Sequence, residues 1–326
     1  MIFYSLQETL LLIAAAIGID WIIGDPKWPT HPVIWMGRLI RMLETLLRRN
    51  EAGRSARQVK YRGILLTVVT LVISFVVIWG ITAVAAWIHP WLGYAVSAWF
   101  ISTTIAVKGL RDAAMLVYRP LIAGRLEEAR KYVGYIVGRD TAHLSPSEAS
   151  RAAVETVAEN TVDAFVSPIL FALIGGAPLA MFYRAGNTLD SMVGYRNERY
   201  VNFGWCSART DDGLNYIPAR LTGLLLIIAA YLNRGMSASR SWASMRQFAH
   251  RHPSPNSGIP ESAVAGALGI ELGGINSYFG QPSERARMGW PLRALDPYDI
   301  VRSVRLLYTV SILMMAGVLG LWLILF

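Results

Sequence analysis

The chain has 326 residues, of which 54% are hydrophobic and 16% are charged, and its formal net charge is +9. A mean hydropathy of +0.38 lies well above that of a soluble domain and predicts a membrane protein. The positive charge does not indicate a nucleic-acid-binding protein, because the sequence contains no zinc-finger spacing, RNP motif or compact basic helix. Cys206 is the only cysteine, which excludes disulfides within the chain and cysteine-rich metal sites.

Long runs without charged residues predict the membrane-spanning helices, since about 20 residues are needed to cross the hydrocarbon core. Residues 63–107 fit two helices with a break near His89 and Pro90, because proline ends one helix and tolerates the start of the next. Residues 164–183 and 306–326 fit one helix each.

Two further apolar runs are shorter. Residues 221–233 would have to include Arg220, or be buried by neighbouring helices, to cross a membrane. Residues 9–19 have neither the basic start nor the cleavage site of a signal peptide, and we interpret them as a retained segment. We therefore expect an all-α, polytopic helical membrane protein with about four to six membrane-inserted helices, which forms a single domain over residues 1–326.

Arginine and lysine concentrate in three segments between the apolar runs. Residues 24–62 contain nine of them, residues 108–163 contain eight, and residues 233–305 contain nine. Positive charge accumulates on the cytoplasmic side of membrane proteins. We therefore expect these segments to form cytoplasmic helical loops.

Residues 20–32, DWIIGDPKWPTHP, contain Asp20, the turn-forming tripeptide GDP with Asp25, and His31 directly before a further proline. Gly, Asp and Pro commonly end a helix, and the neighbouring tryptophans are typical anchors at a membrane surface. A helix stop at the membrane edge is the first interpretation, and Asp25 and His31 are second-rank candidates for a functional site.

Residues 137–165 contain a helix-start signal. Ser145 and Glu148 form a capping box, and Pro146 stands at the first helical position. We therefore expect a helix that begins here and leads into the apolar run at residues 164–183.

Glu155, Glu159 and Asp163 recur every four residues along that helix and are expected on one face. Three carboxylates in a row repel one another unless a cation or a cationic ligand lies there. A solvated helix face is the alternative. Because the row leads into an apolar segment, where ionisable residues are costly and usually functional, we favour a site.

The densest polar cluster follows in residues 184–220. It includes Arg184, Asn187, Asp190, Ser191, Arg196, Arg209, Asp211, Asp212 and Asn215. Adjacent acids such as Asp211 and Asp212 suit Mg²⁺, which prefers carboxylates together with phosphate oxygens. The arginines suit phosphate oxygens. Ion pairs within the cluster are the alternative interpretation.

Residues 250–274 contain the turn SPNSG, followed by a predicted helix opened by Pro260 and Glu261. Such a helix start exposes backbone N–H groups and favours anions. His250 and His252 have no third ligand nearby and are interpreted as turn residues rather than zinc ligands. The sequence contains no P-loop, GxGxxG, HExxH or GxSxG motif.

Several of these segments, in this order, resemble one family. They are DWIIGDP with HP, VGRD, ETVAENTVD, NTLDSMVGYRNERY, ARTDD with PAR, and SPNSGIPESAVAGALG. The family is that of the cobalamin-biosynthesis membrane proteins CobD/CbiB, adenosylcobinamide-phosphate synthase. The resemblance runs from about residue 20 to about residue 280.

The resemblance implies an ATP-dependent amide ligation. The free propionate of adenosylcobyric acid is joined to 1-amino-2-propanol O-2-phosphate, which gives adenosylcobinamide phosphate. An acyl phosphate intermediate would need ATP, Mg²⁺ to neutralise phosphate charge, and arginine to stabilise the transferred group. A general base would keep the incoming amine unprotonated.

Candidate site residues follow from the resemblance and the residue types. The catalytic candidates are Glu155, Glu159, Asp163, Asp190 and Asp212, and the candidate metal ligands are Glu159, Asp163, Asp211 and Asp212. The candidates for binding substrate or phosphate are Arg139, Asn160, Arg184, Asn187, Arg196, Arg209, Ser254 and Asn256. We expect these groups to converge at one edge of the bilayer.

The expected partners are the corrinoid substrate, the amino-alcohol phosphate and membrane lipid, without nucleic acid. Docking of soluble cobalamin-pathway enzymes and homo-oligomer formation stay open. We expect an integral protein of a bacterial or archaeal cytoplasmic membrane, with its active site facing the cytoplasm.

A single crossing by residues 164–183 would place residues 184–216 outside, away from ATP. We therefore favour a re-entrant hairpin with a break at Gly175, Gly176 and Pro178, or a cavity that opens to the cytoplasm. The alternative functions are a Mg²⁺-dependent membrane phosphotransferase, a transporter, and a scaffold for corrinoid-pathway enzymes. The scattered acids argue against the first, and the lack of inverted repeats argues against the second.

Overall fold

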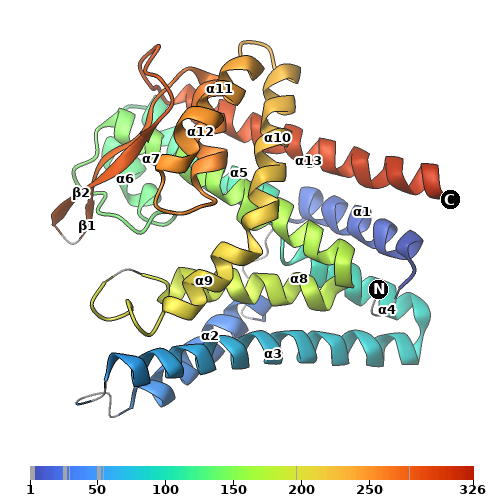
Figure 1. The fold of residues 1–326 in the computed structure, drawn as a ribbon. Coiled ribbons are helices and arrows are strands. Elements are labelled where there is room, and N and C mark those ends of the chain that lie inside the picture. The colour runs from blue at the N-terminus through green and yellow to red at the C-terminus, as the bar shows by residue number, and fades with distance from the viewer. Residues whose placement is uncertain are drawn as a thin grey trace. The chain divides into compact units, whose positions relative to one another are not determined.

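The structure, a computed structural model, describes residues 4–24, 28, 30–49, 53, 55–195, 197–278 and 280–326. These residues form helices and one β-hairpin (Figure 1). The helices are α1 (Leu6–Ile22), α2 (Pro32–Arg48), α3 (Ala56–Ile88), α4 (Pro90–Ser102), α5 (Val107–Ile122), α6 (Leu126–Val133), α7 (Pro146–Thr161), α8 (Ser167–Val193), α9 (Trp205–Leu214), α10 (Tyr216–Leu232), α11 (Ala238–Phe248), α12 (Gly258–Leu268) and α13 (Tyr298–Leu325). A π-helical turn, η1, covers Val162–Val166, a 3-10 turn, η2, covers Ala249–Arg251, and the strands are β1 (Leu272–Tyr278) and β2 (Gln281–Met288).

Three helical stretches in the described ranges are long and apolar enough to cross a membrane. They are Ala56–Ile88, Pro146–Val193 and Tyr298–Leu325, and a fourth is counted if α9 and α10 together form one span. The predicted class, a helical membrane protein, is confirmed.

The chain divides into two compact units. Unit 1 comprises residues 1–106, 167–215 and 317–326, and unit 2 comprises residues 107–166 and 216–316. Unit 1 therefore contains α1 to α4, α8 and α9. Unit 2 contains α5 to α7, α10 to α12 and the hairpin, while α13 begins in unit 2 and ends in unit 1.

Two predicted helix boundaries are confirmed. Helix α3 ends before His89 and α4 begins at Pro90, and the N–H of Trp91 donates to His89 Nδ1 over 3.3 Å. Helix α7 begins after Ser145, whose side chain and backbone form the reciprocal capping box with Glu148. Local capping chemistry thus fixes both positions.

Helix α3 is the central contact element of unit 1 and packs against α2, α4, α8 and α9. Its buried stripe includes Gly63, Thr67 and Ser74, and such small side chains allow close helix approach in membranes. A Cβ on Gly63 would lie 1.8 Å from the carbonyl oxygen of Phe203. Thr67 Oγ1 lies 2.9 Å from Ser207 Oγ on α9. The opposite side of α3 exposes valines and other apolar side chains, as expected of a lipid-facing surface.

The apolar run at residues 164–183 contains the predicted break. Gly175 and Gly176 have non-helical backbone angles inside α8, and Gly176 has φ 64° and ψ −155°. This combination is essentially restricted to glycine. The break itself is confirmed, whereas a re-entrant course of this segment stays a prediction.

Unit 2 is built around α12, which packs against α11, α10 and α7. Every residue of α12 is buried, because apart from Glu261 and Ser262 its side chains are small and apolar on all sides. A Cβ on Gly266 would lie 2.4 Å from the carbonyl oxygen of Arg240 on α11. Helices α11 and α12 lie side by side in Figure 1 for this reason.

The β-hairpin corrects the expectation that the basic segments contain only helical loops. Strands β1 and β2 pair antiparallel, with Ile275 opposite Glu284 and an irregularity between Leu272 and Gly274. The sequence LGGINSY carries two glycines at positive φ, Gly273 and Gly274. Glycine is depleted in strands. The sequence of β1 therefore lacks the clear alternation of apolar and polar residues from which a strand is predicted.

Candidate functional site

Four of the residues predicted for the site line one cavity in unit 2, which we call the Arg139 cavity. It measures about 130 Å³ and its walls include Arg139, Glu155, Glu159, Asn160, Tyr278 and Arg285. Helix α7 supplies the two glutamates and Asn160, the segment after α6 supplies Arg139, and the hairpin supplies the other two. Its volume corresponds to roughly four water molecules in the liquid. This suits a phosphoryl group and is too small for a whole nucleotide.

Glu155 is a buried carboxylate with several partners. Its Oε2 lies 2.9 Å from Arg139 Nη1, and the two side chains are 7% and 4% exposed. Its Oε1 accepts from the N–H of Gly273 over 2.8 Å and lies 3.7 Å from Arg151 Nε. Such a group is fixed in place and its charge is balanced. This environment favours a role in positioning Arg139 over a role in proton transfer.

Arg139 retains donors that none of the described residues satisfies. Asn276 Oδ1 accepts from Arg139 Nη1 over 2.6 Å and from Arg151 Nη2 over 3.0 Å. Nε and Nη2 of Arg139 are buried and have no hydrogen-bond partner in the described part of the chain. A buried donor left unsatisfied costs about 1–3 kcal/mol. An anionic oxygen in the Arg139 cavity would satisfy both donors, which indicates a ligand site.

The SPNSG turn lies against Glu159, although nearly 100 residues separate them in sequence. Ser257 Oγ donates to Glu159 Oε1 over 2.8 Å. The N–H groups of Asn256 and Ser257 each donate to Ser254 Oγ over 3.3 Å. These two amides are thus used inside the turn rather than presented to an anion. Phosphate binding by Ser254 and Asn256 stays a prediction.

Sequence reasoning missed the pair His252 and Glu261. Their Nε2 and Oε1 atoms lie 3.8 Å apart, and the side chains are 7% and 3% exposed. Burial, with the charges of Glu155 and Glu159, raises the pKa of Glu261 well above its ordinary value of 4.5. Burial lowers the pKa of His252 from its ordinary 6.5. Both shifts favour the neutral forms, which is typical of groups poised for proton exchange.

A signal for this pair exists in the sequence. The stretch PESAVAGALG has no polar face, so it predicts a helix buried on all sides, and Glu261 stands in its first turn. A carboxyl group there must be buried. We assigned Glu261 only as a helix-opening residue and His252 only as a turn residue.

Asp163 does not share the geometry of the two glutamates. The π-helical turn at Val162–Val166 interrupts the four-residue spacing, and Asp163 is absent from the walls of the Arg139 cavity. Within the described ranges, no group of three or more His, Cys, Asp or Glu side chains is placed to hold a metal ion. The metal roles of Glu159, Asp163, Asp211 and Asp212 stay predictions.

A second set of predicted residues meets in unit 1, between α8 and α9. Arg184 Nη1 donates to Asn187 Oδ1 over 3.4 Å, and Asn187 Nδ2 donates to Asp211 Oδ1 over 3.3 Å. Arg209 Nη1 lies 3.5 Å from Asp212 Oδ2, with the arginine side chain 64% exposed. The chain from Arg184 to Asp211 brings together residues from two helices. The exposed ion pair of Arg209 and Asp212 on α9 agrees with the alternative interpretation of this segment, in which its charged residues pair with one another.

The remaining candidates lie apart from these sets or outside the described ranges. A Cβ on Gly194 would lie 1.9 Å from Asp190 Oδ1, so this glycine allows the carboxylate to fold back on the end of α8. His31 caps α2, since the N–H of Val33 donates to its Nδ1 over 3.4 Å. Asp25 and Arg196 lie outside the described residues. Convergence of all the candidates on one site stays a prediction.

Comparison with known proteins gives consistent matches over most of the chain. Residues 13–307 match the family model described as CobD/Cbib protein. The cobalamin biosynthesis protein CobD of Geobacter metallireducens is 48% identical over 303 residues, which cover 93% of each chain. The protein of that name from Klebsiella pneumoniae is 47% identical over 97% of this chain and 99% of its own. The cobalamin biosynthesis protein CbiB of Salmonella typhi is 46% identical over 94% of this chain and 96% of its own. No solved structure matches the chain.

Proposed function

The chain belongs to the CobD/CbiB protein family of cobalamin biosynthesis, and from that premise we propose that it is an ATP-dependent amide ligase. The substrates are adenosylcobyric acid and 1-amino-2-propanol O-2-phosphate, and the product is adenosylcobinamide phosphate. The observation that carries the proposal is the Arg139 cavity, where a buried guanidinium group has two donors without a partner among the described residues.

The proposed reaction has two steps. A propionate oxygen of the corrinoid attacks the γ-phosphorus of ATP, which forms an acyl phosphate and releases ADP. The amine nitrogen then attacks the acyl carbon, the bond to the phosphate oxygen breaks, and inorganic phosphate leaves. The amine gives up one proton to a base of the protein. Activation is required because a free carboxylate has no adequate leaving group.

Arg139 and Arg285 are assigned to the phosphoryl group in the Arg139 cavity. An arginine fork offers two parallel donors to phosphate oxygens, and such donors stabilise charge that develops during phosphoryl transfer. Glu155 and Asn276 orient Arg139 through the ion pair and hydrogen bond described above. They act as positioning residues.

Glu159 is assigned as the base for the incoming amine. Its carboxylate lines the Arg139 cavity and accepts a hydrogen bond from Ser257. No arginine or lysine in the described ranges forms an ion pair with it. A carboxylate of this kind can accept a proton at the cavity wall. The charge of Glu159 also acts on the buried pair of His252 and Glu261, where it acts to raise the pKa of both groups, against the effect of burial at His252 and together with it at Glu261.

Mg²⁺, when bound with ATP, would neutralise phosphate charge. Asp211 and Asp212 are adjacent on α9 and offer the carboxylate oxygens that this ion prefers. One or two protein carboxylates suffice for Mg²⁺, because the nucleotide phosphates and water complete its coordination. We propose a cytoplasmic membrane location with the site facing the cytoplasm, where ATP is present.

Reconstitution tests this function. Purified protein in detergent receives adenosylcobyric acid, ATP, Mg²⁺ and aminopropanol phosphate, and the products are separated by mass. The expected result is adenosylcobinamide phosphate with one ADP per amide formed, and none without ATP. Protein that binds the corrinoid but forms no product under these conditions would support a transporter or a scaffold instead.

A further inference from the structure

A second cavity in unit 2 is unrelated to the Arg139 cavity and contains four arginines. It measures about 370 Å³ and lies between the end of α10 and the first turns of α13. Its walls include Arg234, Arg293, Arg302 and Arg305, together with Leu268 and Tyr298. We call it the four-arginine cavity. The proposed ligase reaction assigns none of these residues a role.

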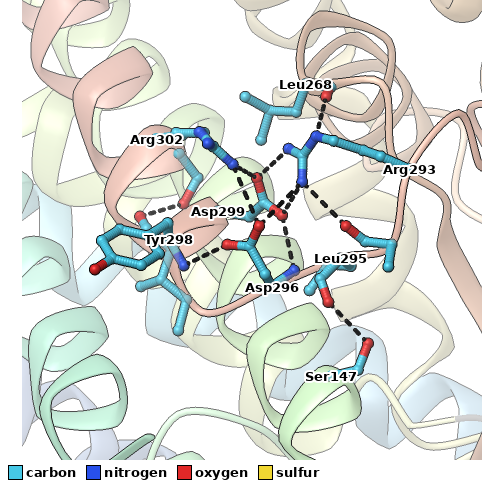
Figure 2. A network of polar contacts seen from close by, with 11 residues as sticks. Ser147, Leu268, Arg293, Leu295, Asp296, Tyr298, Asp299 and Arg302 are labelled. Atoms are coloured by element: carbon cyan, nitrogen blue, oxygen red, sulfur yellow. Dashed lines mark hydrogen bonds and ion pairs between the residues drawn. The ribbon is translucent and has the colours of Figure 1, made fainter. Parts of the chain in front are cut away.

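Two of the four guanidinium groups are fixed by acids. Arg293 Nη1 lies 2.8 Å from Asp299 Oδ2, and Arg302 Nη1 lies 2.9 Å from Asp299 Oδ1. Asp296 Oδ2 lies within 3.5 Å of Arg293 and 3.7 Å of Arg302. Figure 2 shows both arginines gathered around the two aspartates. The Asp299 side chain is fully buried, so this arrangement is part of the fold and not a flexible surface pair.

The other two guanidinium groups have no acidic partner among the residues that the structure describes. Arg234 and Arg305 are exposed, and neither side chain has a hydrogen bond or ion pair within the described ranges. Four guanidinium groups against two carboxylates leave a formal excess of two positive charges around one cavity. Like charges gathered in this way are unfavourable unless an anion is present.

The cavity also borders an apolar surface that faces outward. Asn233 Nδ2, at the end of α10, donates to Thr309 Oγ1 on α13 over 2.8 Å. Next to this contact, Tyr231 and Leu232 are 80% and 57% exposed, and Ile312, one turn further along α13, is 55% exposed. Exposed apolar side chains on helices of a membrane protein are typical of lipid contact. Arginines directly beside such a surface lie at headgroup level.

We propose that the four-arginine cavity binds the phosphate headgroup of an anionic membrane phospholipid. The arginine forks bind the phosphate oxygens, the excess charge selects an anionic over a zwitterionic lipid, and the acyl chains follow the apolar sides of α10 and α13. The volume accommodates a phosphoglycerol group. A soluble phosphate would share this chemistry but would make no use of the adjoining apolar surface.

Lipid binding to the full-length protein tests the proposal. Native mass spectrometry of detergent-purified protein, titrated with phosphatidylglycerol or phosphatidylcholine, measures the affinity for each lipid. The double variant Arg234→Gln/Arg305→Gln should lose about tenfold or more in affinity for phosphatidylglycerol, because each arginine near a membrane surface contributes to anionic lipid binding. Within the described ranges neither side chain has a partner whose loss would disturb the fold, and an unchanged Tm verifies this.

The matched control is Lys131→Gln/Arg246→Gln, which removes two exposed charges elsewhere in unit 2. It should bind phosphatidylglycerol as the wild type does. Equal losses in both double variants, or no loss in either, would overturn the proposal. It would also be overturned if the wild type showed no preference for phosphatidylglycerol over phosphatidylcholine while inorganic phosphate bound in an Arg234- and Arg305-dependent manner, since the ligand would then be a soluble phosphate.

Discussion

Arg139 combines a buried ion pair to Glu155 with two donors that no described residue satisfies. Removing its charge would break the buried ion pair to Glu155, at a cost of about 3–5 kcal/mol, so the informative variant is Arg139→Lys. Lysine keeps the charge and loses the planar fork. We expect kcat/KM of the ligation to fall about 100-fold while the protein stays folded.

The matched control for this substitution is Arg130→Lys. Arg130 also belongs to unit 2 and donates to the carbonyl oxygen of Leu144, but it does not line the Arg139 cavity. Activity assays and thermal unfolding of both variants separate a lost phosphate contact from a general loss of stability. Equal activities in the two variants would contradict the assignment of Arg139 to the phosphoryl group.

Glu261 should make stability depend on pH in a defined direction. Because its pKa is raised in the folded protein, the folded state holds this proton more tightly than the unfolded state does. Its contribution to the free energy of unfolding is full below pH 4.5 and is lost as pH rises through the folded pKa. Glu261→Gln mimics the neutral form, so its Tm should rise relative to the wild type as pH increases above 4.5.

Thermal unfolding in detergent across pH 4.5 to 8 measures this difference. Glu127→Gln is the control, because that carboxylate is 85% exposed and its loss should shift the curve little. His252 acts in the opposite sense, since its pKa is lowered in the folded protein. Its contribution to the free energy of unfolding is present above pH 6.5 and is lost as pH falls through the folded pKa. A Tm difference between Glu261→Gln and wild type that is constant with pH would contradict the raised pKa.

At the scale of single elements, the break in α8 depends on one backbone conformation. Gly176 has φ 64° and ψ −155°, a region in which other residues are strained. Gly176→Ala should lower the free energy of unfolding by about 1–3 kcal/mol. Gly18→Ala in α1 is the control, because a Cβ there meets nothing within 4 Å and alanine favours a helix by about 0.5–1 kcal/mol. Opposite changes in Tm are expected, and a lowered Tm in both variants would speak against strain at Gly176.

Helix starts and breaks were predictable because their causes are local. The causes are the capping box at Ser145, the proline after His89, and the pair Gly175 and Gly176. Each of them acts within a few residues. The hairpin was missed because glycines at positive φ replace an alternating pattern in β1. The π-helical turn at Asp163 was missed for a related reason: a four-residue spacing in sequence assumes regular α-helix throughout.

At the scale of the whole molecule, hydropathy and the charge-free runs predicted the membrane class, since both reflect the solvent that surrounds the chain. The grouping of site residues was predictable only in part. Glu155, Glu159 and Asn160 are neighbours in sequence, but Arg285 and the His252 and Glu261 pair reach the same region through the packing of the hairpin and α12. Contacts between residues so far apart in the chain produce no local sequence pattern from which they could be predicted.

The orientation of the protein in its membrane can be tested at its single cysteine. Cys206 is half-buried on α9, in the segment with Asp211 and Asp212. If that segment meets cytoplasmic ATP, a membrane-impermeant maleimide should label Cys206 in inverted vesicles and not in intact cells. A membrane-permeant maleimide should label it in both. Labelling by the impermeant reagent only in intact cells would contradict a cytoplasmic site.

The fate of one oxygen atom tests the proposed chemistry most directly. Adenosylcobyric acid labelled with ¹⁸O in its free carboxylate is incubated with the purified protein, ATP, Mg²⁺ and aminopropanol phosphate, and the inorganic phosphate is analysed by mass. Activation as an acyl phosphate transfers one labelled oxygen from each carboxylate to inorganic phosphate, and we expect this label in step with amide formation. Amide formed with unlabelled phosphate, or with the label in AMP, would contradict the account.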